Sequence, residues 1–174
     1  MEKHANWATD YLDKELDKNF QVIRPRMPQQ DNASYKEWKI IFEKYVALLG
    51  DQVILMGNSR GGLFLAKYLS ENKFPKKIVA TFLTCPPYGN NEKEREVVGD
   101  FKLKPDLSLI ERNSPDLTLS FSIDDECVPV YTADQYRKKL PNAKICIYKD
   151  KCGHFKCSTF PEIIKQIKAS VKKN

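Results

Sequence analysis

Long apolar runs are missing from this chain of 174 residues. A membrane span needs about 18 consecutive apolar residues, and no stretch of this chain approaches that length. No apolar signal-peptide core follows Met1. A regularly spaced, even-numbered set of cysteines is missing too, because the five cysteines are scattered along the chain. These absences argue against a membrane-spanning protein and against a secreted disulfide scaffold, and they favour a cytoplasmic protein.

A strong excess of one charge is also missing. The net charge of +6 is moderate, and no aromatic residues are interleaved with the basic ones as they are in many nucleic-acid-binding surfaces. Several lysines near the C-terminus have the spacing of a solvated helix face: Lys165, Lys168, Lys172 and Lys173. We therefore expect no nucleic-acid or membrane partner, and the sequence indicates no protein partner. A hydrophobic content of 41% suits one domain over residues 1–174.

The most informative stretch that is present is Gly57-Asn58-Ser59-Arg60-Gly61, which has the pattern G-x-S-x-G. A short apolar run precedes it at residues 52–56, and a good helix start follows at residues 62–69. This context predicts a nucleophile elbow, in which Ser59 is held on a sharp turn between a strand and a helix. We expect a side chain at either Gly57 or Gly61 to collide with the turn. The alternative is that Ser59 only caps a glycine-rich helix start.

An acid and a base follow two strand-like runs farther along the chain. Asp124 and Asp125 come at the end of residues 117–123, and His154 comes shortly after residues 145–148. Loops at the carboxyl ends of parallel strands meet in the crevice where ligands bind. The order serine, acid, histidine is that of hydrolases with a nucleophile elbow. The sequence thus predicts a triad of Ser59, Asp125 and His154, and the other histidine, His4, is in the wrong place.

Each of these residues also has a simpler interpretation. Asp125 is equally typical of a turn before a proline, and His154 of a surface loop. Asp124 competes with Asp125 for the acid role, and we favour Asp125 because a valine-proline pair follows it by three and four residues. We accordingly expect Asp125→Asn to reduce activity strongly and Asp124→Asn to reduce it little. A zinc site at Cys152, His154 and Cys157 is a further alternative, which lacks the second ligand pair that such sites usually have.

Four stretches form a wider pattern: residues 7–16, 53–62, 124–129 and 152–156. Together they resemble the small serine hydrolases related to retinoblastoma-binding protein 9, a branch of the α/β-hydrolases. The resemblance implies that Ser59 is the nucleophile, Asp125 the acid, His154 the base and the Arg60 backbone N–H an oxyanion donor. It also implies hydrolysis of small esters or amides without a metal or organic cofactor. The Leu-x-Cys-x-Glu sequence that gave the family its name does not occur here.

One element of that fold is not where we expect it. In the α/β-hydrolase fold, a strand precedes the helix that residues 7–16 resemble, and its glycine-rich loop supplies a second oxyanion N–H. Residues 1–6 contain neither an apolar run nor a glycine. The expected fold is therefore a three-layer, α/β-hydrolase-like parallel sheet that lacks the first strand. The alternative function is a catalytically impaired hydrolase-fold protein that acts as a binding or interaction module.

The remaining elements are expected to alternate along the chain. Strands are predicted at residues 20–25, 53–56, 77–83, 117–123 and 145–148. Helices are predicted at residues 62–72, 132–140 and 161–171, and a further helix with an apolar stripe is predicted between a capping box at Ser34 and Glu37 and a stop at Gly50. In the long irregular segment 85–115, Tyr88, Phe101, Leu103 and Leu107 are predicted to form a short cap over the site.

Overall fold

The computed structural model describes residues 6–16, 18–89 and 99–172. Its centre is a parallel sheet of four strands in the order β1-β2-β3-β4. The strands are β1 (Gln52–Asn58), β2 (Lys77–Thr84), β3 (Leu117–Ser122) and β4 (Lys144–Tyr148). Each overlaps a predicted strand, so four of the five strand predictions are confirmed. All four run in one direction, so their carboxyl ends lie along the same edge of the sheet.

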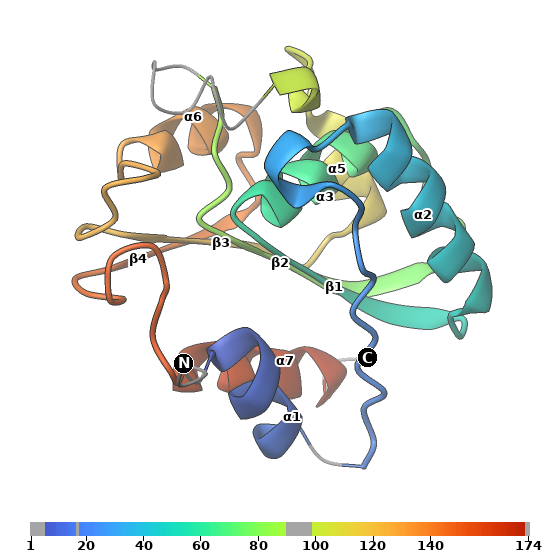
Figure 1. Cartoon of the computed structure of the whole chain (residues 1–174), viewed down its shortest axis with the longest axis horizontal. Coiled ribbons are helices and arrows are strands. Elements are labelled where there is room, and N and C mark those ends of the chain that lie inside the picture. Colours follow the sequence, from blue (N-terminus) through green and yellow to red (C-terminus); the bar gives the residue numbers. More distant parts are fainter. Residues whose placement is uncertain (1–5, 17, 90–98, 173–174) are drawn as a thin grey trace.

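Helices cover both faces of this sheet, which makes the three layers that the sequence predicts (Figure 1). One face carries α2 (Tyr35–Leu48), α3 (Arg60–Glu71), α5 (Ser108–Asn113) and α6 (Thr132–Lys139). The other face carries α7 (Pro161–Lys172), α1 (Leu12–Glu15) and the π-helical turn η1 (Trp7–Tyr11). Two short 3₁₀ turns, η2 (Gln30–Asn32) and η3 (Gly99–Phe101), lie in the connections. None of the described helices is both long and apolar enough to cross a membrane.

The inner strands are hydrophobic because they are covered on both sides. Every residue of β3 is buried, and every residue of β2 except Lys77. The helix α7 lies on the face of the sheet opposite α3, and its Ile163, Ile164 and Ile167 are buried in the core. A sheet that is covered in this way exposes its strand ends, and these ends become the surface on which a site can form.

Phe101 shows that the predicted cap is wrong in one respect. It is 1% exposed and lies with its ring centre 5.2 Å from that of Trp38 and 6.4 Å from that of Phe64, between α2 and α3. Leu107 is buried as well. Both residues therefore belong to the hydrophobic core, because an apolar side chain gains more from the α2–α3 layer than from a solvent-facing cap. Residues 90–98 of the same segment lie outside the described part of the chain.

The predicted strand at residues 20–25 is also wrong. The segment is extended, with Phe20 and Val22 packed on the core, but it forms no strand ladder. Its ordered contacts come from Arg24, which donates to the Ala8 carbonyl and forms an ion pair with Asp13. An extended segment without a paired neighbour is not stable as a strand. Within the described ranges, no residue pairs with the outer edge of β1, so β1 is an edge strand.

The capping box at the start of α2 is replaced by a contact from far along the chain. The Ser34 side chain makes no capping hydrogen bond. Instead, the Asp100 carboxylate accepts a hydrogen bond from the Tyr35 backbone N–H at 2.9 Å. An aspartate supplies the same acceptor for an unpaired helix N–H as a capping serine would. The helix ends at Leu48, next to the predicted stop at Gly50.

Candidate active site

Ser59 stands on a sharp turn between β1 and α3, as the G-x-S-x-G pattern predicts. Its backbone has a positive φ, with φ 51° and ψ −122°, a combination that non-glycine residues rarely adopt. The Ser59 N–H donates to the Thr84 carbonyl at 2.8 Å, which fixes the turn to the end of β2. A non-glycine residue in such a conformation costs about 1–3 kcal/mol, and positions of this kind cluster at functional sites. The turn places Ser59 at the N-terminus of α3, where the helix dipole is positive.

The glycines around Ser59 differ in why they are needed. A Cβ at Gly57 would lie 2.5 Å from the Gly61 carbonyl oxygen, so no side chain fits there. A Cβ at Gly61 would meet nothing within 4 Å, so the predicted collision at Gly61 is wrong. The second position where a side chain would be crowded is Gly62, because a Cβ there would lie 3.1 Å from the Gly57 oxygen and 3.2 Å from Pro86 Cβ. The close packing of strand against helix thus depends on Gly57 and Gly62.

The three residues of the predicted triad are joined by hydrogen bonds. Ser59 Oγ lies 2.7 Å from His154 Nε2, and His154 Nδ1 lies 2.8 Å from Asp125 Oδ2. Ser59 follows β1, Asp125 follows β3 and His154 follows β4, so residues 95 and 29 positions apart meet at one sheet edge. The other histidine, His4, lies outside the described residues.

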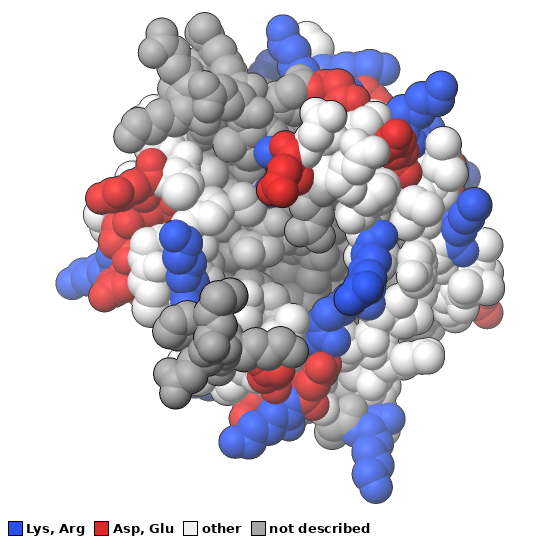
Figure 2. All heavy atoms as spheres, viewed as in Figure 1, with Lys and Arg blue, Asp and Glu red and all other residues white. Residues whose placement is uncertain are grey.

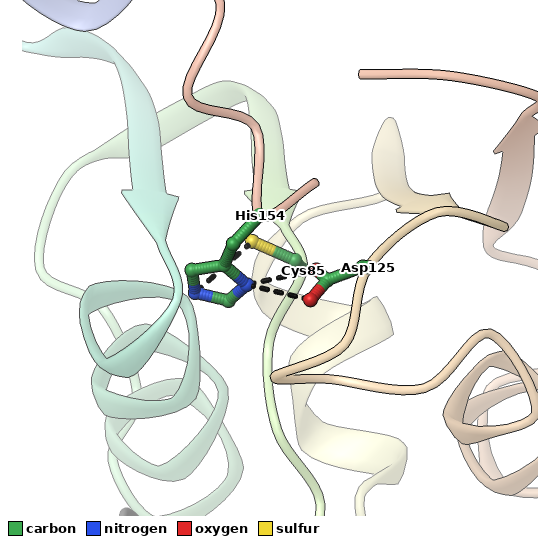
Figure 3. Close-up of side chains that lie close together, drawn as sticks. All are labelled: Cys85, Asp125 and His154. Atoms are coloured by element: carbon green, nitrogen blue, oxygen red, sulfur yellow. Dashed lines mark hydrogen bonds and ion pairs between the residues drawn. The ribbon is translucent and has the colours of Figure 1, made fainter. Parts of the chain in front are cut away.

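The Asp125 carboxylate is buried and fully occupied by donors. Its side chain has no exposed surface, and Oδ1 accepts hydrogen bonds from the backbone N–H groups of Cys127 and Val128 at 2.8 and 2.9 Å. The same carboxylate faces His154 Nδ1 (Figure 3). Because an ionised carboxylate only accepts, Nδ1 carries the proton and Nε2 is left to accept the Ser59 hydroxyl proton. Asp125 thereby orients the ring for Ser59.

Asp124, the competing acid, has a different set of contacts. Its carboxylate accepts hydrogen bonds from the Lys151 N–H at 3.0 Å and the Gly153 N–H at 2.6 Å, and another from Ser122 Oγ. The bond from Ser122, followed by that from Gly153, holds the pKa of the Asp124 carboxyl well below its usual range. Asp124 thus contacts the backbone of the loop that carries His154, whereas the imidazole itself is bonded to Asp125 and Ser59.

The other side of the His154 loop is held by Trp7. The indole Nε1–H donates to the Phe155 carbonyl at 3.0 Å, and the Trp7 backbone N–H donates to the Cys157 carbonyl at 3.2 Å. The Trp7 ring packs edge-on against Phe160 with ring centres 5.1 Å apart. The loop contains three residues with positive φ, Cys152, Gly153 and Phe155, so contacts on both sides stabilise an unusual backbone.

Cys85 is a site residue that sequence reasoning missed. It follows β2 with φ 40°, it is fully buried, and its Sγ lies 3.8 Å from His154 Nε2 (Figure 3). Its thiol donates to Asn58 Oδ1 at 3.3 Å. Burial, together with the nearby Asp125 carboxylate, raises the pKa of the Cys85 thiol well above its usual range. The available signal was its position directly after a strand, the position that Ser59 also has.

A metal ion would find one group of potential ligands in the described part of the chain. Cys85, Asp125 and His154 offer ligand atoms that lie within 4.8 Å of one another. Asp125 and His154 are hydrogen-bonded to each other, and the Cys85 thiol donates to Asn58 Oδ1. The alternative trio of Cys152, His154 and Cys157 is not among the groups that meet this distance within residues 6–16, 18–89 and 99–172.

Arg60 is the first residue of α3, directly after Ser59. Its backbone N–H therefore belongs to the first helical turn, where amide groups point outward from the helix end.

Charges of both signs are interspersed over the face seen in Figure 2, with no broad surface of one sign among the described residues there.

The comparisons with known proteins concern the fold. No family model matches the chain. The ydeN gene product from B. subtilis matches with a TM-score of 0.74 and 15% identity over 84% of this chain and 80% of that one. MGS-MChE2, an α/β-hydrolase enzyme from a metagenome of lagoon sediments at Mar Chica, Morocco, matches with a TM-score of 0.55 and 22% identity over 85% and 75%. The Pyrococcus furiosus esterase Pf2001 matches with a TM-score of 0.55 and 20% identity over 79% and 62%.

These likenesses, together with the parallel sheet and its flanking helices, show that the chain has the α/β-hydrolase fold. The predicted fold class is confirmed. The narrower resemblance to the retinoblastoma-binding protein 9 relatives stays a prediction, as do the roles of Ser59, Asp125, His154 and Arg60. Function has to be argued from the site, because one fold supports many activities.

Proposed function

We propose that this protein is a serine hydrolase that cleaves small carboxylic esters or amides through an acyl-enzyme on Ser59. The observation that carries the proposal is the continuous line of hydrogen bonds from Ser59 Oγ through His154 to Asp125. A hydroxyl is a weak nucleophile until a neighbouring base accepts its proton, and this arrangement supplies such a base. Two of the similar structures are those of an α/β-hydrolase enzyme and of an esterase, which agrees with the proposal.

The reaction would begin with Ser59 Oγ attacking the substrate carbonyl carbon while its proton moves to His154 Nε2. Asp125 stabilises the imidazolium that results, and its bonds from Cys127 and Val128 keep the carboxylate in place. His154 then gives the proton to the leaving alcohol or amine. A water molecule, deprotonated by the same nitrogen, cleaves the acyl-enzyme and restores Ser59. Every step uses side chains and water, so the proposed mechanism requires no cofactor.

The backbone N–H of Arg60 is the oxyanion donor in this proposal. A tetrahedral intermediate on Ser59 develops negative charge on the former carbonyl oxygen, and α3 begins at the next residue. The helix N-terminus favours this charge, and one oxyanion donor typically contributes ~10²–10³ in turnover. The donor is a backbone group, so its position depends on the turn that Gly57 and Gly62 allow.

We further propose a cytoplasmic location and kinship with the retinoblastoma-binding protein 9 relatives. All five cysteines are free thiols, which suits a reducing compartment. The stretch that begins at Trp7, one of those that carry the resemblance, holds the His154 loop.

The proposal is tested with a fluorophosphonate probe, which reacts with activated serines. Wild-type protein should be labelled, and the adduct should map to Ser59 by peptide mass. Ser59→Ala should not be labelled, whereas Ser158→Ala, which removes an exposed serine of the neighbouring loop, should be labelled like the wild type. Equal labelling of Ser59→Ala and the wild type would remove Ser59 from the nucleophile role.

The alternative, a hydrolase-fold binding module, is favoured by one observation. The outer edge of β1 has no ladder partner among the described residues, and such an edge can pair with a strand of another chain. A folded wild-type protein that neither reacts with the probe nor hydrolyses activated esters would favour this module over the enzyme.

A further inference from the structure

The loop that carries His154 also carries two cysteines that the proposed mechanism does not use. Cys152 is exposed and Cys157 is half-buried, and both are free. Cys157 Sγ donates to the Lys151 carbonyl, the group directly before Cys152, at 3.4 Å. Cys152 is also close enough to contribute to the raised pKa of Cys157. The Cys157 thiol therefore lies against the backbone that leads into Cys152, across a loop of six residues that contains His154.

This loop is irregular, and contacts near its start and its end hold it. Cys152, Gly153 and Phe155 have φ values of 56°, 73° and 52°. Asp124 holds the loop near its start through the Gly153 N–H, and Trp7 holds it near its end through the Phe155 and Cys157 carbonyls. A new covalent bond across the loop would therefore compete with these hydrogen bonds, because no helix or strand fixes the backbone in between.

A disulfide across the loop would fix the two sulfurs at covalent distance. A disulfide requires a sulfur–sulfur distance of about 2.05 Å and a Cβ–Cβ distance of about 3.8 Å. His154 is two residues after Cys152 and three before Cys157, so the loop would have to adjust next to it. A misplacement of about 1 Å at a reacting group costs roughly 10²-fold in rate. The hydrogen bond of 2.7 Å between Ser59 and His154 leaves little room for such a shift.

We propose that Cys152 and Cys157 form a reversible disulfide that switches the enzyme off by displacing His154 from Ser59, an inference that rests on the proposed hydrolase function. The oxidant is a small disulfide such as oxidised glutathione. The exposed Cys152 thiolate attacks one of its sulfurs and releases one thiol. Cys157 then attacks the Cys152 sulfur of the mixed disulfide and releases the second thiol. Two protein thiols are oxidised, one external disulfide is reduced to two thiols, and the thiol protons pass to these products.

The order of attack follows from exposure and burial. Burial, and next the nearby Cys152 side chain, raise the pKa of Cys157 to about 11, so Cys157 is the protonated partner until the mixed disulfide forms. Cys85 is not expected to compete, because it is fully buried and burial raises the pKa of its thiol well above the usual range. The bond that forms is local, and a thiol reductant should reverse it.

The test treats the full-length protein with oxidised glutathione and follows three readouts. A non-reducing digest should give a Cys152–Cys157 linked peptide. Ester hydrolysis should fall by about 10²-fold and recover with dithiothreitol. The His154 imidazole proton resonance, assigned by its loss in His154→Ala, should shift. Cys157→Ser should show no linked peptide and no comparable fall, whereas Cys146→Ser, which removes a free cysteine of β4 outside the loop, should respond like the wild type. Each variant is compared with its own reduced form.

Three results would overturn the switch. These are a mixed disulfide at Cys152 with no linked peptide, a linked peptide with unchanged hydrolysis, and a linked peptide with an unchanged His154 resonance. Failure of the hydrolase proposal is distinguishable, because the reduced wild type would then show no turnover. In that case the peptide map and the His154 resonance still decide whether the disulfide forms and displaces the ring.

Discussion

The Asp124 carboxylate accepts the Gly153 N–H at 2.6 Å, which joins the loop of the acid to the loop of the base. Asp124 and Asp125 are neighbours in the sequence, and both accept hydrogen bonds from the loop that carries His154. Asp125 bonds the His154 ring itself, and Asp124 bonds the backbone on the N-terminal side of that ring. The pair therefore fixes both the direction of the imidazole and the position of its backbone.

This relationship changes the expectation for Asp124→Asn, for which the sequence alone predicts little effect. The amide that replaces one carboxylate oxygen would place a donor against the backbone N–H of Lys151 or Gly153. We expect turnover to fall roughly tenfold with little change in KM, because the loop shifts the base and not a substrate contact. Steady-state kinetics on an activated ester measure both turnover and KM. Asp124→Glu, which keeps the charge, should recover part of the loss, and activity equal to wild type in Asp124→Asn would contradict the positioning role.

The stability of the protein should also depend on Asp124 at acid pH. Its folded-state pKa lies well below the ordinary value of 3.8, so the unfolded chain binds this proton more readily than the folded one. The stabilisation is therefore present above the ordinary value and is lost as the pH falls below it. Thermal melts from pH 7 downward should show wild type and Asp124→Asn converging in strong acid. A constant difference in Tm at every pH would contradict this linkage.

Removing the base or its acid should reduce activity far more than Asp124→Asn does. His154→Ala is expected to lower turnover by several orders of magnitude, and Asp125→Asn by up to about 10⁴-fold, because the wrong tautomer then faces Ser59. The double variant Ser59→Ala/His154→Ala should be no worse than either single one, since the residues act as a unit. Additive losses would argue against a shared mechanism.

The glycines of the turn provide a matched pair of substitutions. Gly61→Ala should be tolerated and should stabilise α3 by up to about 1 kcal/mol, because its Cβ meets nothing within 4 Å. Gly62→Ala should destabilise the protein, because its Cβ would press on the Gly57 carbonyl and on the rigid Pro86 ring. Chemical denaturation of the two variants compares them directly. The reverse order of stability would contradict the packing described for this turn.

The elements that the sequence predicts are those that depend on local pattern. The strand–glycine–serine–helix order around Ser59 is contained in one short stretch, and the positions of Asp125 and His154 follow from the rule that parallel strands share a carboxyl edge. Cys85 and His154 are 69 residues apart in the sequence, and the position of Cys85 directly after a strand indicates only the sheet edge on which it lies. The Asp100 cap of α2 is likewise a contact from far along the chain.

Two of the wrong predictions, the strand at residues 20–25 and the cap, have the same cause. Residues 20–25 have the composition of a strand, but a strand exists only where a neighbour pairs with it, and pairing is a property of the sheet. Phe101 lies in a polar, irregular segment, so the sequence suggests a surface position for it. Its burial between α2 and α3 depends on Trp38 and Phe64, which are distant in sequence. Burial of such residues is decided by tertiary packing.

The central claim is that Ser59 forms an acyl-enzyme with His154 as its base. The most direct measurement mixes the wild type with p-nitrophenyl acetate in a stopped-flow instrument, quenches the reaction in acid and maps the acetyl group by peptide mass. The account predicts acetylation at Ser59 that appears before steady state, and no acetyl group on Ser59 in His154→Ala on the same timescale. Acetylation that maps to Cys85 or another residue, or that is equally fast without His154, would contradict it.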